Sequence, residues 1–128
     1  MPVSLAELLS WLAGEGYRLK DSGTGGGPVG DRLLRLTNGD MGVRLTRHDG
    51  EWSVGLSCRA WGGGWFDASL VAATLDHRDL AVPMGLAEQV DFVKARLGRD
   101  LARADDQSAL WAALQESWTR KTRLQFGL

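Results

Sequence analysis

The chain has little of what most metal, redox and nucleotide sites need. It has one cysteine, Cys58, and two histidines among 128 residues, so no intrachain disulfide can form and no oxidising compartment is required. His48 and His77 are 29 positions apart and belong to no H-x-x-x-H or C-x-x-C pair, which excludes the common zinc spacings. We therefore expect no metal and no cofactor.

Long apolar runs and a strong net charge are also missing. No stretch approaches the ~20 apolar residues of a membrane span, and the start M-P-V-S-L-A-E does not have the charged and apolar regions of a secretory signal. Fifteen basic and 16 acidic residues give a net charge of −1, which gives no overall attraction to nucleic acid or anionic membranes. These absences predict a cytoplasmic protein without a nucleic-acid or membrane partner.

Catalytic and phosphate-binding motifs are absent or incomplete. Residues 25–30, G-G-G-P-V-G, match the letters of G-x-G-x-x-G, but a dinucleotide site needs a helix after this loop, and here a predicted strand follows. No G-K-[ST] or G-x-S-x-G is present. Cys58 has the apolar register of a strand, which favours a buried thiol over a nucleophile. We expect no catalytic residue and no enzyme.

The residues that are present predict one α+β domain over residues 1–128. Ser4 and Glu7 fit a capping box for a helix over residues 4–13, which Gly14 and Gly16 end, and a short strand is possible over residues 17–20. Apolar residues then alternate between Arg32 and Cys58 around the turns N-G and D-G. This period predicts an antiparallel meander of three to four strands, with Arg35 or Arg44 on the polar face for water or a partner.

Three helices are predicted after the meander. Asp67 can cap a short helix through Leu75, an apolar stripe runs from Leu86 to Leu101, and a last helix carries Leu110 and Leu114. We expect these helices to pack mainly on one face of the sheet. Trp11, Trp52, Trp111 and Trp118 follow the apolar registers and are expected in the core, whereas Trp61 and Trp65 flank three glycines outside any period. Those two are either a hydrophobic lid or partner contacts.

Three segments resemble small bacterial immunity-type proteins that occur beside polymorphic toxins. The segments are V-R-L-T-R-H-D-G-E-W-S-V-G-L, W-F-D-A-S-L-V-A-A-T-L and L-A-E-Q-V-D-F-V, and the resemblance covers about residues 31–97. It implies a small protein without catalytic residues that binds and neutralises a cognate toxin. A small-ligand module or cryptic enzyme that uses the Gly23–Gly30 loop and the Trp61–Trp65 turn is an alternative, and a secretion chaperone or adaptor is another.

The partner-binding residues that we predict are aromatic or acidic. From Trp65 to Asp106, acidic residues outnumber basic ones by eight to five, so this half of the chain offers either an acidic surface for a basic partner or an ordinary solvated helix face. The candidates are Trp61, Trp65, Asp67, Asp76, Asp79, Asp105 and Asp106.

Overall fold

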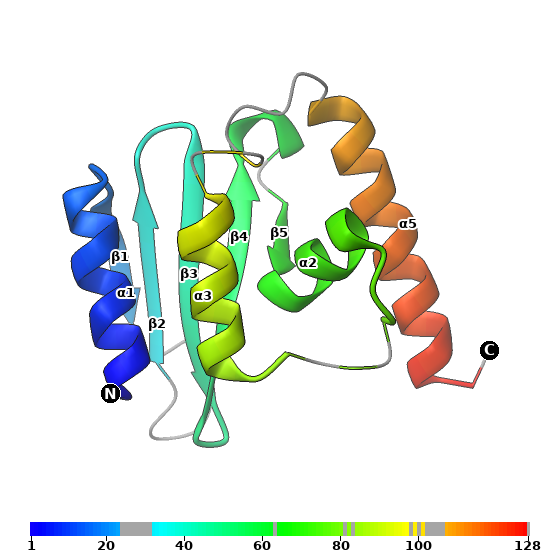
Figure 1. The fold of residues 1–128 in the computed structure, drawn as a ribbon, viewed down its shortest axis with the longest axis horizontal. Coiled ribbons are helices and arrows are strands. Elements are labelled where there is room, and N and C mark those ends of the chain that lie inside the picture. Colours follow the sequence, from blue (N-terminus) through cyan, green and yellow to red (C-terminus); the bar gives the residue numbers. More distant parts are fainter. Residues whose placement is uncertain are drawn as a thin grey trace.

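A computed structural model describes residues 1–23, 32–62, 64–80, 82, 84–97, 99, 101 and 107–127. Ten elements follow one another along the described chain (Figure 1). They are α1 (Val3–Gly14), β1 (Arg18–Gly23), β2 (Arg32–Thr37), β3 (Met41–His48), β4 (Glu51–Cys58), the 3-10 turn η1 (Arg59–Trp61), β5 (Trp65–Asp67), α2 (Ala68–Asp76), α3 (Leu86–Arg96) and α5 (Gln107–Gln125).

The strands form one antiparallel meander in the order β1-β2-β3-β4-β5. This confirms the α+β class with an N-terminal helix and an antiparallel sheet. The sheet has five strands because Trp65–Asp67 pairs with β4 as an edge strand. Three residues after a glycine-rich stretch are too few to show an alternating period, so the sequence predicted a turn here and not a strand.

The turn that joins β3 to β4 has the backbone that its sequence predicts. His48 pairs with Glu51, and the two residues between them, Asp49 and Gly50, have φ angles of 51° and 79°. Two consecutive positive φ angles match the right-handed twist of a two-residue hairpin, which is why Asp-Gly suits this position. The strong turn at Asp49-Gly50 fixes the register of the two central strands.

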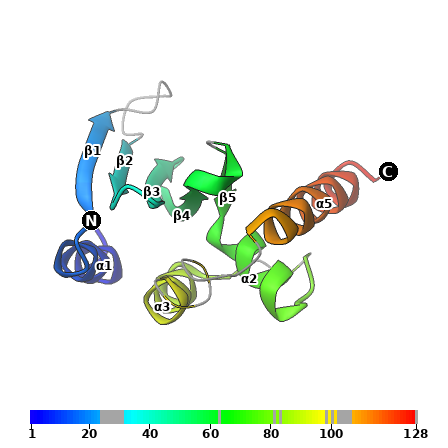
Figure 2. The ribbon, with the colours of Figure 1, turned by 90° about the horizontal axis from the view of Figure 1, so that it is seen from above.

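Helices cover only one face of this sheet. Figure 2 shows α1, α3 and α2 on the same side of the strands, with α5 beyond β5. The side chains that point towards the helices form the core, with Val43, Leu45, Val54 and Leu56 fully buried. Packing of the helices mainly on one face is thus confirmed, and the other face of the sheet carries no helix in the described chain.

The first helix differs from its prediction at the start and agrees at the end. It begins at Val3, with Pro2 as the N-cap and no side-chain cap hydrogen bond, so the capping box with Ser4 as the N-cap is wrong. The carbonyl of Pro2 accepts from the amides of Leu5 and Ala6 instead. At the other end Gly16 has φ 88°, and the amide of Tyr17 donates to the carbonyl of Leu12, as in a Schellman motif.

The last two helices differ from their predictions in different ways. The predicted apolar stripe from Leu86 to Leu101 is longer than its helix. The helix α3 ends at Arg96, and Leu97 and Leu101 are buried beyond that end. Among the residues of α5 whose side chains are described, Leu114 and Ser117 are buried, while Trp111 and Trp118 are 38% and 54% exposed. Their placement in the core is therefore wrong. The helix lies against α2 and η1 at the edge of the domain, where only one narrow face meets other elements.

Candidate functional site

The face of the sheet without helices, here called the open face, has a polar and aromatic surface. The pairing register puts alternate residues of β2, β3, β4 and β5 on it. These residues are Leu33, Arg35, Thr37, Gly42, Arg44, Thr46, Ser53, Gly55, Ser57, Trp65 and Asp67, together with Asp21 of β1. A face of this composition needs no helix to cover it and is available to a partner.

Two glycines make room for two flat side chains on the open face. A Cβ atom added at Gly42 would lie 2.9 Å from Cη2 of Trp65, and one added at Gly55 would lie 3.2 Å from Nε and 3.4 Å from Nη2 of Arg44. The indole therefore lies on Gly42 and the guanidinium lies flat on Gly55. Arg44 Cζ is 5.1 Å from the centroid of the Trp65 ring, a cation–π distance. We call these two side chains the Arg44–Trp65 layer.

The open face also places two arginines opposite each other. Arg35 and Arg44 are direct cross-strand partners, and like charges in such a pair destabilise a sheet. Oδ1 of Asp21 lies 3.0 Å from Nε of Arg35 and compensates that charge. Arg44 has no carboxylate within 4.0 Å among the residues that the structure describes, so no ion pair there compensates its positive charge.

The Nε atoms of Arg35 and Arg44 are buried without a hydrogen-bond partner in the described chain. At Arg35 the carboxylate of Asp21 lies close enough for an ion pair, but it is out of line with the N–H bond, so charge is compensated and a donor is left over. At Arg44 both the charge and the donor are left over. Unsatisfied buried donors are rare in folded proteins and costly, so the strands hold these two arginines against the sheet at a cost in stability.

Two hollows adjoin Trp65 of the Arg44–Trp65 layer. One, the Arg44 groove, has a volume of about 270 Å³ and lies between the open face and α5; Arg44, Trp65, Asp67, Trp118, Lys121 and Gln125 line it. The other has a volume of about 350 Å³ and is lined by Arg35, Thr37, Gly42, Ser57, Arg59 and Trp65, among others. Trp65 thus borders both hollows, and the exposed Trp118 forms the opposite wall of the groove.

The two tryptophans that the sequence left open have different positions. Trp61 is 2% exposed and packs edge-on against Phe66, with ring centroids 5.7 Å apart. It belongs to the core and offers no contact surface in this structure, and its Nε1 has no partner in the described chain. Trp65 is half-buried on the open face. Of the two lid candidates, only Trp65 is placed to touch a partner.

The acidic candidates do not come together in one place. Asp67 is exposed at the N-cap position of α2, as predicted, but makes no side-chain cap hydrogen bond. Asp79 is exposed in the segment after α2, beside a hollow of about 330 Å³. Asp105, Asp106 and residues 24–30 of the glycine loop lie outside the described residues, whereas Gly23 is the last residue of β1.

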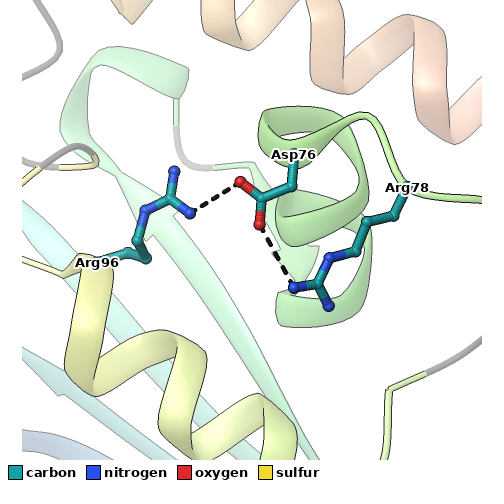
Figure 3. A network of polar contacts seen from close by, with 3 residues as sticks. All are labelled: Asp76, Arg78 and Arg96. Atoms are coloured by element: carbon teal, nitrogen blue, oxygen red, sulfur yellow. Dashed lines mark hydrogen bonds and ion pairs between the residues drawn. The ribbon is translucent and has the colours of Figure 1, made fainter.

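Asp76 has a structural role. Its Oδ1 lies 2.9 Å from Nη1 of Arg96, and its Oδ2 lies 3.7 Å from Nη2 of Arg78 (Figure 3). The carboxylate joins the ends of α2 and α3, and Arg96 also lies 5.5 Å from the ring of Phe92. Part of the acidic excess in this half of the chain is thus matched by arginines within the protein.

Arg35 and Arg44 were predicted on the polar face, but the close contacts of Gly42 with Trp65 and of Gly55 with Arg44 were not. Glycine inside a strand often marks the close approach of another group, and Gly42 and Gly55 were the available signal.

The described chain shows no cluster of three or more potential metal ligands and no helix long and apolar enough to cross a membrane. In comparisons with known proteins, no family model, no curated protein and no solved structure matches this chain.

Proposed function

We propose that this chain is a non-catalytic binding protein that neutralises a cognate bacterial toxin through the open face of its sheet. The observation that carries the proposal is the Arg44–Trp65 layer, which holds an uncompensated cation and a half-buried indole on a face that no described helix covers. Tryptophan and arginine are the residues most enriched among interface hot spots. The resemblance of residues 31–97 to immunity-type proteins supplies the kind of partner.

The test is co-expression with the product of the neighbouring gene. We expect that product to be toxic alone, harmless with this chain, and co-purified with it. Arg44→Gln should weaken the complex by at least about tenfold, because truncation of an interface hot spot costs ~2 kcal/mol or more. Arg47→Gln is the matched control, since Arg47 lies on the same strand and points to the other face.

The outcomes separate this proposal from its alternatives. A neighbouring protein that is neither toxic nor co-purified would remove the basis of the immunity role, and a harmless one that co-purifies would favour the chaperone or adaptor. A small-ligand function draws support from the hollow of about 330 Å³ beside Asp79 and Leu80, a size that suits small molecules. A thermal-shift screen of metabolites tests it, because a ligand raises the melting temperature by mass action.

A further inference from the structure

We infer that the partner of the open face places an acidic side chain, an aspartate or glutamate carboxylate, on Arg44. This inference rests on the proposed function and names the chemistry of its central contact. The guanidinium keeps its charge at any physiological pH. Beside it stand Arg35 across the strand pair and no carboxylate within 4.0 Å in the described chain. A partner carboxylate that meets the Nη atoms of Arg44, which are not among the buried atoms, supplies the missing negative charge.

The geometry holds Arg44 ready for such a group. One face of the guanidinium rests on Gly55, with Nε, Nη2 and Cζ between 3.2 and 3.6 Å from the position of an added Cβ. Trp65 limits its movement on one side. An arginine held flat in this way can bind a carboxylate through two parallel hydrogen bonds, and little entropy is lost because the side chain is already ordered.

The surroundings favour a protein carboxylate over a nucleic-acid phosphate. Asp67 lines the Arg44 groove, and Asp21 lies on the same face beside Arg35. A phosphate backbone would bring several negative charges against these two carboxylates, whereas one acidic side chain needs only Arg44. Trp65 and the 54% exposed Trp118 flank the groove and suit the aliphatic part of a partner side chain.

The same face argues against a strongly basic partner surface at this point. The acidic excess between Trp65 and Asp106 left a basic partner open beside an ordinary solvated helix face, but Asp76 of that segment is bound to Arg96 and Arg78. Among the described residues, the charged side chains that line the groove are Arg44, Lys121 and Asp67. Complementarity therefore requires a negative group opposite the groove.

A peptide titration followed by NMR tests the inference on the full chain. The probe is acetyl-Gly-Glu-Gly-amide, which has one carboxylate, and the control is acetyl-Gly-Gln-Gly-amide, which has none. We expect the Nε–H signal of Arg44 and the indole N–H signal of Trp65 to shift with the glutamate peptide and saturate with a Kd on the order of 10 mM, as one charged hydrogen-bonded pair allows. The glutamine peptide should leave both signals unchanged.

Variants assign the effect to Arg44. In Arg44→Gln the indole signal of Trp65 should lose its saturable shift, Arg44→Lys should bind at least about threefold more weakly than the wild type, and Arg47→Gln should bind normally. Should Arg44→Gln fail to fold, the wild-type titration and Arg44→Lys still decide the result. Equal shifts with both peptides, no saturation with the glutamate peptide, or tighter binding of inorganic phosphate would overturn the inference.

The titration and the co-expression experiment test the two proposals independently. The peptide needs no toxin, so a saturable shift without a toxic neighbour would leave the carboxylate site and remove the immunity role. A neutralised toxin together with a silent titration would leave the immunity role and remove the carboxylate on Arg44.

Discussion

At the scale of single residues, the open face depends on two glycines, because the space without their side chains is filled by neighbouring groups. Gly42 and Gly55 stand on neighbouring strands, and each supports one member of the Arg44–Trp65 layer. The contacts are of two kinds. At Gly42 the neighbour is the rigid indole of Trp65, and at Gly55 it is the guanidinium of Arg44, whose aliphatic stem lets it give by a few tenths of an ångström. The two glycines therefore differ in what a methyl group would cost.

We predict that Gly42→Ala destabilises the fold and Gly55→Ala does not. The Cβ at residue 42 would stand 2.9 Å from Trp65, so the indole must move, at a cost of about 1–3 kcal/mol. The Cβ at residue 55 would be 3.2 Å from Nε of Arg44, which can shift, and alanine recovers about 0.5–1 kcal/mol of strand stability. Urea unfolding midpoints measure both, and equal losses would contradict the distinction.

Tyr17 gives the protein a predicted sensitivity to alkaline pH. Burial, and then the charges of Glu15 and Asp40, raise the pKa of Tyr17 from 10.0 to about 12. The folded state therefore keeps its phenol proton while the unfolded chain loses it. The contribution of Tyr17 to stability is complete below pH 10 and is lost between pH 10 and about 12, by roughly 2 kcal/mol in all.

Comparison with Tyr17→Phe isolates this effect from other groups that titrate in the same range. The difference in unfolding free energy between the two proteins should be constant up to about pH 9 and then change in favour of the phenylalanine variant. Unfolding curves in urea at pH 7, 9, 10 and 11 provide the measurement. Parallel loss of stability in both proteins would exclude Tyr17 as the source.

At the scale of elements, the sequence was most informative where local chemistry decides the structure. Asp49-Gly50 and the alternation on either side of it predicted two strands and their register, because positive φ angles and a period of two are local properties. The edge strand β5 and the exposure of Trp111 and Trp118 depend on tertiary packing. They are decided by which elements, distant in sequence, lie beside them. No period within α5 distinguishes a tryptophan at the domain edge from one in the core.

Alanine substitutions of the two glycines at the end of α1 should change stability in opposite directions. Gly14 is the last residue of the helix and has no atom within 4 Å of an added Cβ, so Gly14→Ala should raise stability by about 0.5–1 kcal/mol. Gly16 has φ 88°, so Gly16→Ala should lower it by about 1–2 kcal/mol. Thermal unfolding of the pair tests this, and a loss in both variants would show that Gly14 has another role.

Gln89 connects α3 to the sheet in a way that the sequence did not reveal. The strand β5 is too short to pair with all of β4, and Oε1 of Gln89 accepts from the amide of Val54 at 3.0 Å. Its Nε2 donates to the carbonyl of Met84 at 2.9 Å. This side chain is 8% exposed and satisfies the backbone of β4 where its neighbouring strand ends.

Removal of this side chain should therefore be costly. We expect Gln89→Ala to lower the free energy of unfolding by about 2–4 kcal/mol, because the buried amide of Val54 and the partly buried carbonyl of Met84 lose their partner. Asp91→Ala, at an exposed position of the same helix, should change stability by less than about 0.5 kcal/mol. Chemical denaturation distinguishes them, and a small effect at Gln89 would indicate that water replaces its amide.

At the scale of the whole molecule, the architecture was predictable and the candidate site only in part. Residue composition and periodicity gave an α+β domain with one covered face, and Trp65 was singled out correctly as lying outside any core stripe. The sequence did not single out Arg44 as the cation of the open face, because Arg35 and Arg44 have the same register. Its significance comes from Arg35, Asp21 and Trp65, which reach it from other strands.

The uneven packing of the molecule predicts an order of local opening. The central strands β3 and β4 hold fully buried Val43, Leu45, Val54 and Leu56, whereas α5 buries Leu114 and Ser117 and exposes its two tryptophans. Amide hydrogen exchange at neutral pH should therefore be slowest in β3 and β4 and at least about tenfold less protected in the second half of α5, since local stability follows buried contact. The amides of α3, which packs on β4 and α1, provide the internal control and should lie between the two. Equal protection in α5 and the central strands would mean that the C-terminal helix unfolds only together with the sheet.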